Sequence, residues 1–335
     1  MSNVQSKFGP AFLDGALETM QKFFGIVPDV ITVKSKKDFE EHIAIAGLIG
    51  ITAKDFEGSM FIGFSEPCYL DLMEKMIGEK YETLTREIQD GAAEFANIIF
   101  GQAKVPLNEM GFEIRMALPS VIRGTELGSV LNSGNHTTRY LMKLPKGVAL
   151  LEISGRSISA TTSASPVTSG DSIPSLDAKT LMSFVDAVRQ TMQIQCGVEI
   201  DPGVPFRRTD DTAYEFDIGA LIGVNGRAFR GTLAIAFEEK VYRKIYFYMT
   251  KEKHATITDE MGDGASEITN IIFGIAKAKL NEQGHGLQMA LPTMIVGPKM
   301  EFKFESKKPS IALPFNVGAG KMWVEFAFDD LSEAP

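Results

Sequence analysis

The stretch from Asp90 to Gly124, DGAAEFANIIFGQAKVPLNEMGFEIRMALPSVIRG, occurs a second time in this chain. Residues Asp263 to Gly297 read DGASEITNIIFGIAKAKLNEQGHGLQMALPTMIVG, at an offset of 173 positions and without a gap. Twenty-one of these 35 positions are identical. The same offset holds upstream, where the segment beginning at Leu48 matches the segment beginning at Leu221. A repeat of this length predicts two tandem domains rather than one large fold.

The segment between the two copies has a different composition. Residues 157–175 read SISATTSASPVTSGDSIPS, rich in Ser and Thr and interrupted by Pro. Such a segment cannot bury enough apolar surface to order itself, which predicts a flexible linker. We therefore expect one domain over residues 1–156 and a second over residues 176–335, in agreement with the prior of two domains for 335 residues.

Composition narrows the class of protein and its partners. Hydrophobic residues make up 44% and charged residues 23% of the chain, as in ordinary globular proteins. The net charge of −9 provides no basic face, so we expect neither a nucleic-acid nor a membrane partner. The longest apolar run is about half a membrane span, and the first residues lack a targeting signal, which together favour the cytoplasm. The two cysteines, Cys68 and Cys196, are too isolated to predict a disulfide framework or a zinc site.

Each half repeats the same order of predicted elements: a helix, a strand pair, a short helix, a long helix and alternating strands. Asn225-Gly226 is a typical hairpin signal between two of the strands. Thr85 and Thr258 are expected helix N-caps, and Gly111 and Gly284 are expected to follow the helix ends. This order predicts an α+β fold in which mainly antiparallel sheets pack against long helices. The expected helices cover residues 12–24, 67–77, 86–110, 176–195, 241–249 and 259–283, and the expected strands cover 43–52, 58–64, 216–224 and 231–237.

A polar stripe follows one face of each predicted long helix. At about 100° per residue, the first stripe gathers acids, an amide, a glycine and a lysine, opposite a face of apolar residues. Asn is a mediocre helix former, and Gly within a helix costs about 1 kcal/mol relative to Ala, so stability alone does not select this stripe. A solvated face is the simplest alternative, but the glycine would also let another surface approach the amide. The stripes are Asp90, Glu94, Asn97, Gly101, Lys104 and Asn108 in the first copy, and Asp263, Glu267, Asn270, Gly274, Lys277 and Asn281 in the second.

The pattern D-x-x-x-E-x-x-N on a long helix, followed by N-I-I-F-G and M-A-L-P, resembles the CheC/CheX/FliY family of chemotaxis phosphatases. One motif in each half is similar to CheX, and the chain looks like a tandem fusion of two CheX-like domains. Pro119 and Pro292 stand where the family has its downstream proline. CheX-like units usually pair as separate chains, so the two halves here are candidates for an intramolecular pseudo-dimer.

The resemblance implies hydrolysis of the aspartyl phosphate on a phosphorylated CheY-like response regulator. It implies that Asn97 and Asn270 orient the attacking water, and that Glu94 and Glu267 contact the regulator's lysine. An amide is suited to this role because it offers both a donor and an acceptor. The partner regulator would bring the Mg²⁺, so no cofactor or metal of the chain's own is expected. Six further members of the two stripes are expected to contact the partner: Asp90, Gly101, Lys104, Asp263, Gly274 and Lys277.

Two other functions compete with this interpretation. A non-catalytic docking module, like the related switch proteins of the flagellar motor, would bind regulators without hydrolysis; the amide in both copies argues against it. An enzyme with its own metal would use Asp90 with Glu94, or Asp263 with Glu267. Two carboxylates one helical turn apart can touch one ion, but no histidine completes a cluster in the first copy.

Overall fold

The computed structural model describes residues 5–34, 38, 41–53, 56–130, 136–158, 178–209, 212–227, 229–318 and 320–331. Apart from residues 157 and 158, the predicted linker lies outside the described residues, so it stays a prediction. The helices are α1 (Gln5–Phe24), α2 (Glu66–Ile77), α3 (Gly91–Glu109), α4 (Ala178–Thr191), α5 (Glu239–Thr250) and α6 (Asp259–Glu282), with a π-helical turn at Met192–Cys196. The first half holds β1 (Asp29–Val33), β2 (Ile43–Thr52), β3 (Phe56–Phe64), β4 (Arg115–Met116), β5 (Ser120–Val130), β6 (His136–Leu144) and β7 (Gly147–Ser157). The second half holds β8 (Asp201–Pro202), β9 (Phe206–Arg207), β10 (Phe216–Asn225), β11 (Phe229–Phe237), β12 (Gln288–Met289), β13 (Thr293–Phe304), β14 (Ile311–Val317) and β15 (Gly320–Asp330).

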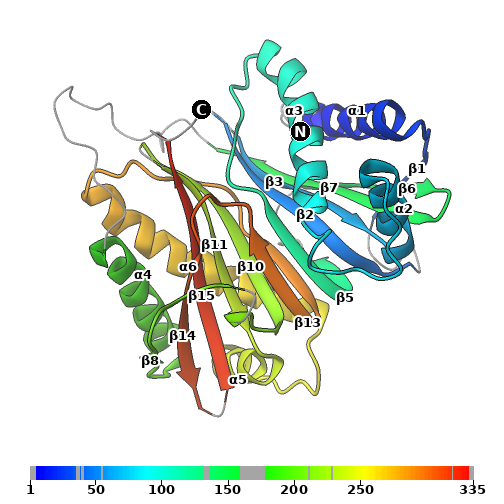
Figure 1. Cartoon of the computed structure of the whole chain (residues 1–335). Coiled ribbons are helices and arrows are strands. Elements are labelled where there is room, and N and C mark those ends of the chain that lie inside the picture. The colour runs from blue at the N-terminus through cyan, green and yellow to red at the C-terminus, as the bar shows by residue number, and fades with distance from the viewer. Residues whose placement is uncertain are drawn as a thin grey trace.

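The strands of both halves join into one antiparallel sheet. Its order is β1-β6-β7-β3-β2-β5-β13-β10-β11-β15-β14-β8, with three two-residue strands, β4, β9 and β12, paired off this path. Helices α1 and α3 lie on one outer side of the molecule and α4 and α6 on the other, with the strands between them (Figure 1). The predicted α+β class, with mainly antiparallel sheet and long helices, is confirmed.

The two halves meet where β5 pairs with β13. In this ladder Val130 pairs with Met294, and Val121 pairs with Lys303. Residues 121 and 294 are equivalent positions of the repeat, as are residues 130 and 303, because each pair of numbers differs by 173. Replacing each residue of one strand pair by its repeat equivalent therefore gives the other strand pair. A register of this kind is the self-complementary one that a twofold axis produces.

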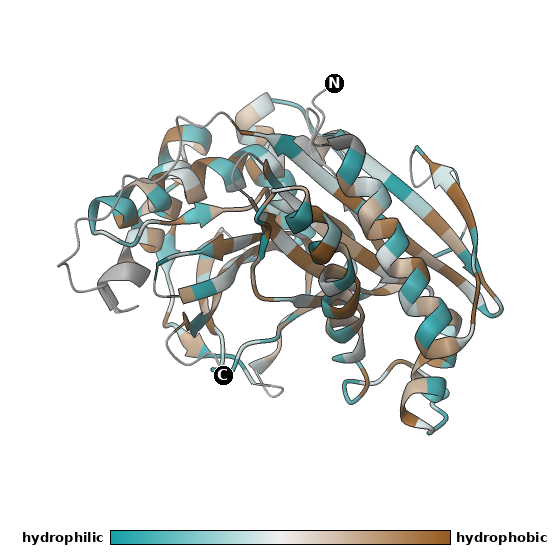
Figure 2. Cartoon of the chain, turned by 90° about the horizontal axis from the view of Figure 1, so that it is seen from above, coloured by the Kyte–Doolittle hydropathy of each residue, from teal (hydrophilic) through white to brown (hydrophobic). Residues whose placement is uncertain are grey.

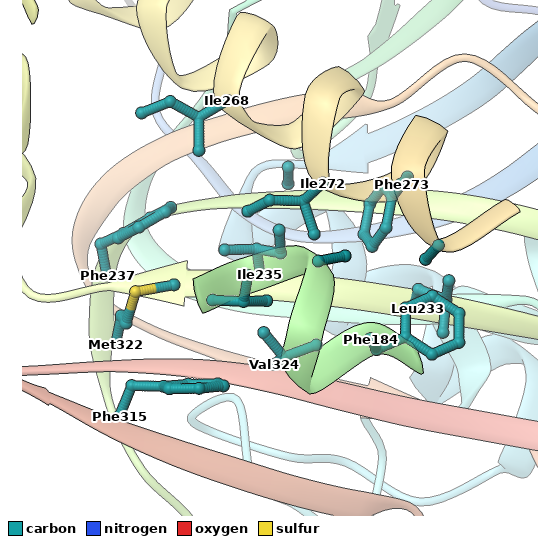
Figure 3. Packing of buried hydrophobic residues seen from close by; sticks show 14 of the residues in the cluster. Phe184, Leu233, Ile235, Phe237, Ile268, Ile272, Phe273, Phe315, Met322 and Val324 are labelled. Carbon is teal, nitrogen blue, oxygen red and sulfur yellow. The ribbon is translucent and has the colours of Figure 1, made fainter. Parts of the chain in front are cut away.

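Each half has its own core between its helices and one sheet face. In the second half, Phe184 of α4 and Ile272 and Phe273 of α6 lie over side chains of β11 and β15, such as Leu233 and Val324 (Figure 3). Hydrophilic and hydrophobic residues alternate along the helices, as expected when only one face of a helix is buried (Figure 2).

A third cluster of buried residues draws on both halves. Leu48 of β2, Leu221 of β10 and Phe302 of β13 belong to it. At its centre the strands approach closely, because a methyl group added at Gly223 would lie 2.9 Å from the Cα atom of Gly50. Asn225 Nδ2 also donates a hydrogen bond of 3.0 Å to Thr52 Oγ1. Gly50 and Gly223, like Thr52 and Asn225, are equivalent positions of the repeat.

Two predicted helix boundaries in the first half are wrong. The long helix begins at Gly91 rather than at residue 86, and its N-cap residue is Asp90 instead of Thr85. Arg86 would place a positive charge at a helix N-terminus, which is unfavourable, and it pairs instead with Glu301 of β13 at 3.2 Å. The first helix starts seven residues earlier than predicted, because Phe8 is itself buried against Phe56.

The expected N-cap of α6 and the glycines expected after both long helices are found in the structure. Thr258 is the N-cap residue of α6, and Gly111 and Gly284, which follow the C-caps of α3 and α6, have φ angles of +87° and +90°. These left-handed conformations are the ones that glycine adopts without steric cost.

Candidate functional site

The polar stripe of α3 faces away from the core. Asp90, Glu94, Gly101 and Lys104 are exposed, and Asn97 is half-buried. The opposite face is buried in the core of the first half through Ala92, Phe95, Ile99 and Ala103, and Ile88, in the turn before α3, is buried in the same core. The spacing argument for the two faces of the helix is therefore confirmed.

A pocket of about 320 Å³ lies beside this stripe. Asp90, Glu94 and Asn97 form one wall, and Met73 and Met76 of α2 form another. The oxygen Oδ1 of Asn97 is buried and accepts no hydrogen bond from a described residue. A buried acceptor of this kind normally bonds a ligand or an ordered water.

The second half contributes to the first site. Lys303 of β13 forms an ion pair with Asp90, and Glu305, which directly follows β13, also lines the pocket. Glu305 Oε1 is buried without a described hydrogen-bond partner. Burial raises the pKa of this carboxyl, and the nearby charges of Asp90 and Glu94 raise it further, while Lys303 lowers it.

No described residue outside their own helical turns packs against the glycines of the stripes. A methyl group added at Gly101 or Gly274 would meet no atom of such a residue within 4 Å. Glycines elsewhere in the fold are required by close contacts; a methyl group at Gly47, for instance, would lie 2.2 Å from the carbonyl oxygen of Ala92. Internal packing therefore does not explain Gly101 and Gly274.

The last members of the two stripes, Asn108 and Asn281, have a structural role. Asn108 Oδ1 accepts a hydrogen bond of 2.8 Å from the backbone N–H of Ile114. Asn281 Oδ1 accepts the equivalent bond of 2.5 Å from Leu287. These two amides fix the turn after each long helix, whereas Asn97 has no such backbone partner among the bonds of the described residues.

The second stripe, on α6, is more open. Glu267, Asn270 and Gly274 are exposed and Lys277 is half-buried, while the side chain of Asp263 lies outside the described residues. The repeat position of Lys303 is Val130, and that of Glu305 is residue 132. Lys303 therefore has no cationic equivalent at the second site.

Sequence reasoning missed Lys303 and Glu305. The alternation along residues 300–305 places Lys303 on the polar face of a strand, but it gives no indication of what that face meets. Asp90 and Lys303 lie 213 positions apart. Only the pairing of β13 with β5 brings them together, so the relevant signal is the register between the halves.

Among the described residues no group of three or more His, Cys, Asp and Glu side chains could hold a metal ion. In the described part of the chain, no helix is both long and apolar enough to span a membrane.

Comparison with known proteins identifies the repeated unit. A family model described as chemotaxis phosphatase CheX matches residues 45–141 and 218–316, one segment in each half. Comparison with curated proteins gave no match.

Solved structures resemble less than half of the chain at a time. A CheC-like superfamily protein from Shewanella sp. PV-4 is 28% identical over 46% of this chain and 99% of its own, with a TM-score of 0.44. CheX from Vibrio vulnificus is 27% identical over 45% of this chain and 100% of its own, with a TM-score of 0.44. The CheX–CheY–BeF₃–Mg²⁺ complex from Borrelia burgdorferi gives 19% identity over 44% of this chain and 97% of the matched one, with a TM-score of 0.37. The two segments that match the family model together exceed half of the 335 residues, and the chain therefore belongs to the CheX family of chemotaxis phosphatases, as a tandem fusion of two CheX-like domains.

Proposed function

We propose that this protein hydrolyses the aspartyl phosphate of a phosphorylated CheY-like response regulator. The observation that carries the proposal is the amide of Asn97, whose buried oxygen accepts no hydrogen bond from a described residue and lies on the pocket wall beside exposed Glu94. The Glu267–Asn270 pair repeats the spacing of these two residues on α6, where both side chains are exposed.

The chemistry needs little from the phosphatase. An acyl phosphate is already activated, and phosphoryl transfer is catalysed largely by positioning and electrostatics. The regulator supplies its own Mg²⁺ and a lysine beside the phosphoryl group. Asn97 and Asn270 each hold the attacking water in line by accepting one of its protons in a hydrogen bond, because an amide oxygen is an acceptor at any physiological pH.

The rest of each stripe serves docking. Glu94 and Glu267 are anionic and exposed, so each can pair with the regulator's lysine and fix the helix over the phosphoryl group. Gly101 and Gly274 let the regulator's backbone approach, since a side chain there would project into open space. Asp90, Asp263, Lys104 and Lys277 extend the contact at the two ends.

The arrangement of the halves supports an intramolecular pseudo-dimer. The symmetric register of β5 on β13 and the contact of Gly50 with Gly223 are what two paired CheX-like units would form. In that arrangement α3 and α6 lie on opposite outer sides, so each could receive one regulator (Figure 1). We place this reaction in the cytoplasm.

The test is the decay of a phosphorylated CheY-like regulator, loaded with a small phosphodonor in the presence of Mg²⁺. We expect the intact protein to accelerate decay, and Asn97→Ala combined with Asn270→Ala to remove about 100-fold or more of that acceleration. Glu109→Gln, an exposed change near the end of α3, is the matched control and should leave the rate unchanged.

Two outcomes would contradict the proposal. Acceleration that survives in the double asparagine variant would reject the role of the amides. Complex formation without any acceleration by the intact protein would indicate a non-catalytic docking module instead.

A further inference from the structure

We propose that Glu305, from the second half, is a positioning residue of the first site, which is therefore assembled from both halves. This inference rests on the phosphatase function proposed above. It adds a residue that lies outside the helical stripe and 208 positions beyond Asn97 in the chain.

The backbone of Glu305 is held from both sides. Its N–H donates a hydrogen bond of 3.0 Å to the carbonyl oxygen of Pro119, in the M-A-L-P segment of the first half. On the other side, Ser306 Oγ and the N–H of Lys307 each donate a bond of 2.8 Å to Asp329, which is buried on β15. Glu305 is thus fixed on the pocket wall by structure that spans the junction of the halves.

Glu305 and Asn97 offer the same chemistry to this pocket. Both residues line the pocket, and each has one buried oxygen, Oε1 and Oδ1 respectively, that accepts no hydrogen bond from a described residue. A water molecule has two O–H donors, and buried waters typically bond such otherwise unpaired groups. A carboxylate beside the amide would further orient the water by accepting a hydrogen bond from its second O–H group.

The charges that face Glu305 come from two elements of the fold. Glu87, Asp90 and Glu94 face it from α3 and the turn before it, and Lys303 faces it from β13. Burial and the charges of Asp90 and Glu94 raise the pKa of Glu305. The carboxylate should therefore take up a proton, which turns one of its two acceptor oxygens into an O–H donor, at a higher pH than an ordinary glutamate does.

The second site cannot be assembled in the same way. The repeat position of Glu305 is Asn132, an uncharged residue, and that of Lys303 is Val130. The second site therefore has no glutamate at this position that could titrate. The two sites should differ in their response to pH even though their helices carry the same Glu and Asn.

The experiment separates the two sites in the full-length protein. Asn270→Ala inactivates the second site, so the activity that remains comes from the first site. Asn97→Ala inactivates the first site, so the activity that remains comes from the second site. In each background we compare Glu305→Ala, which removes the acceptor, and Glu305→Gln, which keeps an acceptor oxygen but cannot ionise. Decay of the phosphorylated regulator is followed from pH 5 to 8, with the regulator's own decay subtracted at each pH.

In the Asn270→Ala background we expect Glu305→Ala to slow the reaction about tenfold, as loss of a group that orients a reactant should. Glu305→Gln should retain most of the rate at neutral pH and flatten the fall in rate toward acid. In the Asn97→Ala background neither change should matter. Thermal unfolding of each variant verifies that the fold is intact.

Equal effects of Glu305→Ala in both backgrounds, or no effect in the first, would overturn the inference and leave the phosphatase function standing. A rise in activity with Glu305→Gln at every pH would also overturn it, because the charge would then hinder the site. Absence of acceleration by the unsubstituted protein would instead reject the phosphatase function itself.

Discussion

Helices α3 and α6 carry the same Asp, Glu, Asn and Gly positions, yet the surfaces around them differ. On α3 the stripe adjoins a pocket that Lys303 and Glu305 of the other half help to form. On α6 the Glu267–Asn270 pair is exposed, and the repeat offers valine and asparagine at the two corresponding positions. Duplication therefore preserved the residues that a helix presents by itself, while the contributions from across the junction diverged.

This difference makes the first site dependent on the junction between the halves. Lys303 and Glu305 lie beside α3 because β13 pairs with β5 and because the N–H of Glu305 donates a hydrogen bond to the carbonyl oxygen of Pro119. A change that shifts the junction should therefore disturb the first site more than the second.

The largest expected effect comes from Gly223, at the centre of the junction. A methyl group there would lie 2.4 Å from the Cβ atom of Ala117, and the backbone of Gly50 blocks retreat. Gly223→Val should lower the free energy of unfolding by about 1–3 kcal/mol, the usual cost of overpacking. In the Asn270→Ala background it should also reduce the activity of the first site, measured by regulator decay.

The matched control is the neighbouring residue Ile222, which faces the helical core of the second half. Ile222→Val should cost about 0.5–1.5 kcal/mol by removing a methyl group, without altering the first site in particular. Equal loss of activity at both sites with Gly223→Val would show that the sites do not differ in their dependence on the junction.

Much of the fold could be predicted from the sequence because the repeat supplies each element twice. The strands at residues 43–52 and 231–237 and the helix that begins at Asp259 are found close to their predicted positions. The start of α3 could not be predicted, since Arg86 finds its partner Glu301 only after the halves have joined.

The candidate site could be predicted only where it depends on one helix. Helical spacing identified Glu94 and Asn97 as neighbours on an outward face, because their separation is fixed by the geometry of the helix. Glu305 reaches the same pocket through the register of β5 on β13, and a single sequence does not encode that register in any local pattern. The contribution of the second half to the first site could therefore not be predicted from the sequence.

A smaller effect, with opposite signs for stability and activity, is expected at the stripe glycines. Gly101→Ala and Gly274→Ala should each stabilise the fold by up to about 1 kcal/mol, because alanine is the better helix former and its methyl group meets no atom within 4 Å. The same methyl group should slow decay of the phosphorylated regulator several-fold by obstructing its approach. Denaturant unfolding and the decay assay measure the two effects separately.

The comparison between the halves sharpens this prediction. Gly101→Ala should affect only the site that remains in the Asn270→Ala background, and Gly274→Ala only the site that remains in the Asn97→Ala background. Variants that gain stability and keep full activity at both sites would show that no surface approaches these glycines during the reaction.

The smallest expected effect concerns Lys303, which forms an ion pair with Asp90. The side chain of Lys303 is 38% exposed and that of Asp90 is 50% exposed. Exposed pairs contribute little, so Lys303→Ala should change the free energy of unfolding by less than about 1 kcal/mol. The effect of Lys303→Ala should lie in the pH profile of the first site, because Lys303 lowers the pKa of Glu305 and its removal lets that pKa rise. Protonation of Glu305 then begins at higher pH. In the Asn270→Ala background, the fall in the rate of regulator decay toward acid should therefore begin at a higher pH. Lys308→Ala, in the loop after β13 and paired with Asp330, is the control and should leave the profile in place. An unchanged or downward-shifted limb in Lys303→Ala would mean that a group other than Glu305 sets the pH response of the first site.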